Sequence, residues 1–396
     1  MPVALRHKIF DAPYGTFYIL SHILCLMKIG VLKEIKAQEH RAGLTPASVR
    51  ELVAAGHEVL VEAKLGAGIN IEDVSYEAAG AQIVTGPDEV FAESEMIVKV
   101  KEPQEAEYKK LRDGQILFTY LHLAADKPQT EGLIASNSVA IAYETVTDRH
   151  GTLPLLTPMS EVAGRLAAQV GAHYLMKHRG GNGRLISGVP GVAPARVTVI
   201  GGGVAGTQAA LMAVGLGAQV TILERAPRRM RQLDELFQGR AVVEHSNMET
   251  LEHAVKASDL TIGAVLIPGA SAPRLVRKDW LKDMQRGAVL VDIAIDQGGC
   301  FETSRATTHL DPVYEVDGVV HYCVANMPGA VPLTSTQALN NATLPYILQI
   351  ANKGWQQALK DDEGLRNGLN VCQGKVTHQG VAESLGYDYH AVETFL

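Results

Sequence analysis

The chain has 396 residues, of which 46% are hydrophobic and 20% charged, and its formal net charge at pH 7 is -7. This is the composition of a well-packed globular protein, and the length favours two or three domains, of which we expect two. The chain lacks the excess of Lys and Arg that binding to nucleic acid or to an anionic membrane requires, so small molecules are the expected partners. The 4 cysteines show no C-x-x-C pairing and no histidine at ligand spacing, which predicts neither a metal site nor a disulfide framework and fits a cytoplasmic protein.

Residues 1–26 differ from the rest of the chain. Charged residues at 6–8 precede apolar runs at 17–20 and 23–26, which is the order found in a signal peptide. No small-residue cleavage site follows, and the run is too short to span a bilayer. We therefore predict an N-terminal extension that takes no part in the fold, with export as the less favoured alternative.

From residue 27 the pattern alternates between buried strands and helices. The first helix has Thr45 as its N-cap and Pro46 at its first position, and Gly56 ends it. The short glycine-containing turns between elements favour a parallel, doubly wound sheet. Strands are expected at 28–32, 58–62, 81–84, 96–100, 115–120 and 139–143, and further helices at 73–79, from 87, and at 106–112.

A long helix at 158–177 and a glycine-rich loop at 180–191 lead to a second series of strands. The tail has a helical pattern at 335–353 and no new strand series, so we expect it to return to the first domain, with a cleft between the two domains. The predicted fold is α/β, with two doubly wound parallel-sheet domains. A Rossmann dinucleotide-binding domain (158–326) is inserted into a discontinuous substrate domain (27–157 and 327–396). The strands of the second series are expected at 197–200, 219–223, 260–265 and 288–295.

A glycine-rich turn opens this second series. Gly201, Gly203 and Gly206 follow the strand at 197–200 directly and precede a helix at 207–215. Such glycines let the backbone turn sharply and approach a pyrophosphate, which the free amides at the helix N-terminus stabilise. The complete strand, turn and helix predict a dinucleotide site much more strongly than the glycines alone.

Glu224 stands about 20 residues further on, where an acidic residue is expected to bind the adenosine ribose. A carboxylate there accepts hydrogen bonds from the ribose hydroxyls and repels a 2′-phosphate, which favours NAD. Arg225, Arg228 and Arg229 weaken the inference, because an arginine beside the ribose can accommodate the phosphate of NADP.

Polar residues follow three of the predicted strands, where ligands bind in open parallel sheets. Each alone fits an ordinary loop role: Lys101 a solvated cation, His122 a capping side chain, Asp296 a turn former. Together with Arg41, which can grip a carboxylate bidentately, they predict oxidation of an α-amino acid. His122 suits the proton transfers and Lys101 can polarise the developing carbonyl. Asp296 is expected to orient His122, the ammonia or the water.

These residues lie in segments that resemble the alanine dehydrogenase family, and the similarity extends from residue 27 to about 373. It implies reversible oxidative deamination of L-alanine to pyruvate and ammonia with NAD, in a cytoplasmic homohexamer that uses no metal and no membrane partner. Two alternatives remain: the NAD(H)-binding subunit of a proton-translocating transhydrogenase, and a dehydrogenase of the same fold for another amino acid. The matching segments are 33–41, VKEP at 100–103, LHL at 121–123, PMSEVAGR at 158–165, GVAP at 191–194, VDIAIDQGG at 291–299 and VANMP at 324–328.

The resemblance also implies individual roles. It makes Arg41 and Lys101 substrate-binding residues and His122 the acid and base. Asp296 and Lys101 are the other catalytic residues that it implies. Glu224 stands where the family often has aspartate, and Arg229 replaces a frequent lysine, so the sequence departs from the family pattern at two of the implied cofactor contacts. The implied cofactor-binding residues are Ser160, Gly201, Gly203, Val204, Ala205, Gly206, Glu224, Arg229, Ser246, Val265, Leu266, Ile293, Asp296, Asn326 and Met327.

Overall fold

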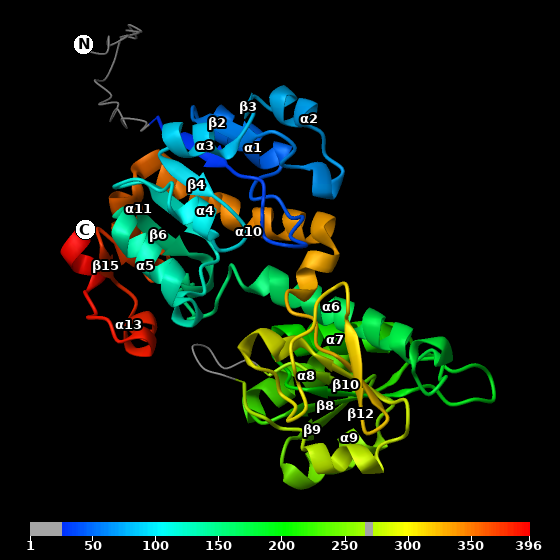
Figure 1. The fold of residues 1–396 in the computed structure, drawn as a ribbon. Coiled ribbons are helices and arrows are strands. Elements are labelled where there is room, and N and C mark those ends of the chain that lie inside the picture. Colours follow the sequence, from blue (N-terminus) through cyan, green and yellow to red (C-terminus); the bar gives the residue numbers. More distant parts are fainter. Residues whose placement is uncertain (1–25, 266–271) are drawn as a thin grey trace, which may run out of the picture.

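The computed structural model describes residues 26–265 and 272–396. The chain forms two α/β bodies, each built on its own sheet, and Figure 1 shows that both the green α6 and the orange α10 lie where these bodies meet. The expected fold class, with two sheets that are mainly parallel, is confirmed. Neither stretch of described chain contains a helix long and apolar enough to cross a membrane. The predicted N-terminal extension falls almost wholly outside the described residues.

The first sheet has eight strands in the order β15-β14-β6-β5-β4-β1-β2-β3. Sequence order runs outward from β1 on both sides, so the order in which strands are added to the sheet reverses between the parallel neighbours β1 and β4. In a parallel sheet such a reversal point is where ligands bind. The strands are β1 (Lys28–Val31), β2 (Glu58–Glu62), β3 (Gln82–Val84), β4 (Met96–Val98), β5 (Ile116–Thr119), β6 (Val139–Ala142), β14 (Leu369–Cys372) and β15 (Lys375–Val376).

The helices of this body begin and end largely as the capping signals predict. Thr45 caps the first helix, since its hydroxyl accepts the Ser48 amide at 3.3 Å. Gly56, just beyond the end, has φ +96°, a conformation that favours glycine. The helices are α1 (Pro46–Ala54), α2 (Asp73–Ala78), α3 (Pro87–Glu93), α4 (Glu105–Tyr108), α5 (Lys127–Ser136), α10 (Pro332–Lys353), α11 (Trp355–Asp361), α12 (Glu363–Arg366) and α13 (Gln379–Leu385).

The second sheet has seven strands in the order β12-β13-β11-β10-β7-β8-β9, and its reversal lies between β7 and β10. Helices pack on both faces, with α7 directly after the glycine-rich turn. The strands are β7 (Arg196–Ile200), β8 (Gln219–Glu224), β9 (Val242–His245), β10 (Leu260–Gly263), β11 (Val289–Asp292), β12 (Val313–Val316) and β13 (Val319–Tyr322). The helices are α6 (Thr157–Tyr174), α7 (Val204–Gly215), α8 (Pro227–Phe237) and α9 (Met248–Ala257).

Helix α6 belongs to both hydrophobic cores. Met159 and Val162, in its first half, pack in the first core, whereas Leu166 and other later residues pack in the second. A Cβ on Gly164 would lie 2.1 Å from the Ala205 carbonyl oxygen, so only glycine allows this close approach of α6 and α7. The glycine-rich turn is thereby held against the helix that joins the two bodies.

Several expectations about elements were wrong. The strand expected at 288–295 ends at Asp292, because that side chain accepts the Ala294 amide at 3.1 Å and starts a 3₁₀ turn, η6 (Ile293–Gln297). The tail was expected to add no strands, yet β14 pairs with β6 in the first sheet and turns into β15 through Gln373 and Gly374. The prediction also omitted the strands β9, β12 and β13, which have four residues each, and the helices α5, α8, α9, α11, α12 and α13.

Candidate active site

The glycine-rich turn between β7 and α7 has a geometry that larger residues cannot adopt. Gly201 has φ +95°. A Cβ on Gly206 would stand 1.8 Å from the Gly201 carbonyl oxygen, so the first turn of α7 lies directly on the end of β7. Gly203 precedes the helix, with Val204 and Ala205 as its first residues. The helix N-terminus therefore presents backbone amides beside a closely packed turn, which fits the pyrophosphate of a dinucleotide.

Glu224, at the end of β8, is tied to this turn. One carboxylate oxygen accepts the Gly202 amide at 2.9 Å, and the other accepts the amides of Arg225 and Ala226 at 2.7 and 2.9 Å. A carboxylate oxygen has capacity for more than one donor, so Glu224 remains able to accept ribose hydroxyls.

Arg229 lies on the other side of the same turn. Its Nε donates to the Gly202 carbonyl at 2.6 Å, and its Nη2 donates to the Thr207 hydroxyl at 2.7 Å. The guanidinium thus fastens α8 to the turn. These hydrogen bonds occupy Nε and Nη2 of Arg229, so fewer of its donors remain for the 2′-phosphate of NADP.

The remaining predicted cofactor residues lie at the ends of neighbouring elements. Ser246 donates its amide to the Glu224 carbonyl at 2.9 Å, and Val265 follows β10 beside Gly201. Ile293 lies on η6, Ser160 in α6, and Met327 is buried in the second core. Leu266 lies outside the described residues.

Arg41 is buried and held by a carboxylate that the sequence argument did not assign. Its Nε and Nη2 donate to the two oxygens of Glu39 at 2.7 and 2.6 Å, and its Nη1 faces the Met159 sulfur at 3.1 Å. Burial alone would raise the pKa of the Glu39 carboxyl, but the hydrogen bonds and charge of Arg41 outweigh it and hold that pKa at about 2. The guanidinium is therefore fixed in direction. Its Nη1 faces a sulfur, a weak acceptor, so it is the nitrogen with the most capacity left to donate to a ligand.

Asn326 connects Arg41 to the second sheet. Its side chain accepts from Arg41 Nη2 and donates to Glu39, both at 2.9 Å. The backbone N–H of Asn326, a residue with φ +59°, donates to the Asp296 carboxylate over a longer distance of 3.4 Å. Arg41 and Asp296 are thus brought into one network, although they follow strands of different sheets.

Lys101 follows β4, and the Glu34 carboxylate holds its backbone in place. Its amide donates to Glu34 at 3.2 Å, and the same carboxylate oxygen accepts the Val100 amide at 2.7 Å. Glu34 in turn binds Lys99, which is fully buried and also contacts Glu107, at 3.0 and 2.7 Å. Lys99 was expected only as a strand residue, and the buried ion triad that it forms with Glu34 and Glu107 supports the backbone of Lys101.

His122 follows β5 in a left-handed conformation, with φ +53°. Its imidazole is stacked on Tyr120, with ring centroids 5.9 Å apart, and its side chain is 48% exposed. Glu144, which was not predicted, accepts the His122 amide at 2.5 Å. Within the described part of the chain no hydrogen bond joins His122 to Asp296, so the structure gives no support to the idea that Asp296 orients the imidazole.

The turn that carries Asp296 is supported by a second buried carboxylate, Asp292. Asp292 accepts the Cys300 amide at 2.8 Å and the Ser304 hydroxyl. Burial raises the pKa of Asp292, and the hydrogen bond from Ser304 lowers it in part. Asp296 itself is exposed, which leaves its carboxylate free to meet a ligand.

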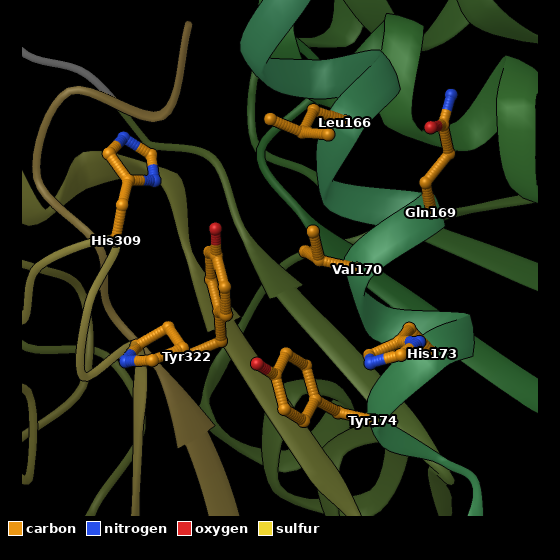
Figure 2. Close-up of a pocket in the computed structure, with 8 residues that line it drawn as sticks. Leu166, Gln169, Val170, His173, Tyr174, His309 and Tyr322 are labelled. Carbon is orange, nitrogen blue, oxygen red and sulfur yellow. The ribbon is translucent and has the colours of Figure 1, made fainter. Parts of the chain in front are cut away.

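A cavity of about 280 Å³ lies between α6 and the end of β13 (Figure 2). Figure 2 shows His309 and Tyr322 facing Val170 and Tyr174 across it. None of its eight lining residues is a predicted site residue, and none carries a permanent charge. We therefore place the candidate site at the strand ends and not in this cavity.

Comparisons with known proteins agree with the sequence resemblance. The model described as "Alanine dehydrogenase/PNT, N-terminal domain" matches residues 30–163, and its C-terminal counterpart matches 167–379. Alanine dehydrogenase of Halomonas elongata is 58% identical over 363 residues, 92% of this chain and 98% of that one. Alanine dehydrogenase 2 of Staphylococcus aureus is 56% identical over 371 residues, 93% of this chain and 100% of that one.

Solved structures give the same result. An L-alanine dehydrogenase aligns with a TM-score of 0.88 at 52% identity, covering 91% of this chain and 99% of that one. Transhydrogenase from Sinorhizobium meliloti has a TM-score of 0.77 at 24% identity over 88% of this chain and 100% of that one, which shows a shared fold alone. The resemblance seen in the sequence is confirmed, and the chain belongs to the alanine dehydrogenase/PNT family.

Proposed function

We propose that this protein catalyses the reversible, NAD-dependent oxidative deamination of L-alanine to pyruvate and ammonia. The observation that carries the proposal is the network from Arg41 through Asn326 to Asp296. It sets a buried guanidinium, suited to a substrate carboxylate, beside the sheet that bears the dinucleotide turn. The high identity to alanine dehydrogenases supports alanine as the substrate.

We assign the chemical roles as follows. NAD supplies the hydride acceptor when it is bound at the glycine-rich turn, whose close packing at Gly206 suits a pyrophosphate. Arg41 binds the substrate carboxylate through Nη1, and Lys101 stabilises the developing carbonyl. His122 takes the amine proton as the imine forms and later transfers protons as water adds. Asp296, exposed beside Asn326, holds the ammonia or the water.

The test is NADH formation with L-alanine at alkaline pH, beside serine, glycine, lysine and, in place of NAD, NADP. We expect turnover with alanine and NAD. His122→Ala should lose most turnover, on the order of 10²-fold or more, and still bind NADH as the unaltered protein does. Binding of NADH without turnover of alanine would contradict the proposal and favour the transhydrogenase-like alternative.

Three finer features belong to the same proposal. We propose a homohexamer in the cytoplasm, domains that divide at residues 157/158 and 326/327, and an N-terminal extension outside the fold. Helix α6 passes from the first core to the second after Val162, which supports a first division within that helix, a few residues beyond the proposed boundary. The mass in solution, measured by light scattering on the full chain and on a chain beginning at Met27, tests the assembly and the extension together.

A further inference from the structure

Glu144 lies beside His122 although it is 22 residues further along the chain. It lies in η3 (Tyr143–Thr145), which follows β6, whereas His122 follows β5. These two strands are parallel neighbours, with Thr119 aligned to Ala142, so their carboxyl ends meet at one edge of the sheet. The sheet order therefore delivers a carboxylate to the histidine from the adjacent strand.

The carboxylate holds the backbone that carries the imidazole. Its Oε1 accepts the amides of Leu121 and His122 at 3.1 and 2.5 Å, and its Oε2 also lies 3.2 Å from the Leu121 nitrogen. His122 needs such support, because its left-handed conformation is unfavourable for a residue with a side chain. The Glu144 side chain is only 14% exposed, so little water competes for these bonds.

The same carboxylate faces one edge of the imidazole. His122 Nδ1 lies 3.9 Å from Glu144 Oε1, and the ring plane lies 7° from that of Tyr120, whose hydroxyl donates to the Leu155 carbonyl. The ring is thus held on one face by a tyrosine that is itself fixed. With Nδ1 toward the carboxylate, Nε2 is the nitrogen left for the substrate.

We propose that Glu144 is a positioning residue for the acid and base His122: it fixes the left-handed turn, selects Nε2 for proton transfer and stabilises the imidazolium. This inference rests on the proposed function only in the role that it gives to His122. Among the described residues, the other titratable or charged groups around the pair are Tyr120, which directly follows β5, His378 before α13, and Arg41 beyond Tyr120.

Glu144→Gln is the decisive variant, because the amide oxygen still accepts the backbone N–H groups while the charge is lost. The carboxylate charge, 3.9 Å from Nδ1, interacts favourably with the imidazolium, whereas the neutral amide of the variant does not. We expect the pH profiles of kcat/KM for alanine oxidation and for pyruvate reduction both to move to lower pH, by about 0.5 to 1 unit. The affinity for NADH should not change.

Two further variants separate positioning from simple structural support. Glu144→Ala removes the acceptor as well, and should lower kcat well beyond the loss in Glu144→Gln. Glu131→Gln is the matched control, since Glu131 is an exposed carboxylate of the same body whose polar partners in the described chain are Lys127 and Tyr387, and its profile should follow that of the unaltered protein. If the profile of Glu144→Gln also follows it, the inference is overturned.

A second readout does not depend on turnover. Acylation of His122 by diethylpyrocarbonate, followed by mass spectrometry of its peptide, reports the neutral imidazole directly, and the ring is accessible enough for it. Glu144→Gln should shift the pH midpoint of this reaction downward by the same amount, even if alanine is not the substrate. An unshifted midpoint would sink the positioning role, whereas a shifted midpoint without alanine turnover would sink the proposed function alone.

Discussion

The two sheets prepare their halves of the candidate site by different means. At the end of the first sheet, cations are set by buried carboxylates: Arg41 by Glu39, and Lys99 by Glu34. At the end of the second sheet, the backbone conformation depends on the absence of a Cβ atom, as at Gly201 and Gly206. The difference follows from what each half is expected to bind. A small carboxylate substrate needs a directed charge, whereas a pyrophosphate needs close access to amides.

The comparison predicts different failures. In the first body a substitution that leaves a buried charge without its partner should cost folding stability. In the second body a substitution that adds a single carbon should cost dinucleotide binding, because the backbone has no room to yield. The following changes test this contrast, in order of decreasing expected effect.

Lys99→Met should have the largest effect, because it leaves Glu34 and Glu107 buried without a cation. We expect a loss of roughly 3–5 kcal/mol in the free energy of unfolding. Urea denaturation followed by circular dichroism measures it. Lys109→Met, which removes an exposed ion pair with Glu105, is the matched control and should leave the midpoint unchanged. Equal midpoints for the two variants would show that the buried triad is not a stabilising feature of the first body.

Acidification should weaken the Glu39–Arg41 pair. A carboxyl whose pKa falls from 4.5 to about 2 on folding contributes roughly 3 kcal/mol at neutral pH. Because the folded-state pKa is the lower one, this contribution is complete above pH 4.5 and is lost as the pH falls towards 2. Glu39→Gln should therefore be much less stable than the unaltered protein at pH 6, and the difference should shrink steadily below pH 4.5. A difference that is independent of pH would contradict the ion-pair argument.

Gly206→Ala should weaken NADH binding by roughly tenfold to a hundredfold, since relieving a contact of 1.8 Å must shift the Gly201 carbonyl. Fluorescence titration with NADH measures the effect. Gly215→Ala, at the other end of α7, is the control, because a Cβ there meets no atom within 4 Å. If Gly206→Ala binds NADH as tightly as the control does, close packing of the turn is not what shapes the pyrophosphate site.

Glu224→Gln should have the smallest effect, because the amide oxygen can replace part of the carboxylate's acceptor role towards Gly202, Arg225 and Ala226. Its loss of charge should reduce the preference for NAD over NADP by about tenfold, as repulsion of the 2′-phosphate disappears. The ratio of kcat/KM values for the two cofactors is the measurement. An unchanged ratio would remove Glu224 from the ribose site.

Local signals in the sequence were enough for many of the elements. Thr45 and Pro46 placed the start of α1, and the run at 58–62 matched β2. These local signals failed where contacts formed in the folded chain decide where a strand ends or which strand it pairs with. The strand expected to reach Ile295 stopped at Asp292, whose carboxylate captures local amides, and the tail supplied β14 because β6 offered it a free edge.

The sequence by itself determined the fold class, the dinucleotide turn and the residue types that substrate chemistry needs, because periodicity, glycine spacing and strand-end polarity are local properties. Only the tertiary structure decided the distant partners: Asn326 for Arg41, Glu34 for the Lys101 backbone, and Glu144 for His122. Those pairings depend on which strands become neighbours and on how α6 joins the two sheets. Strand order is a non-local outcome of packing, which a linear pattern of residues does not contain.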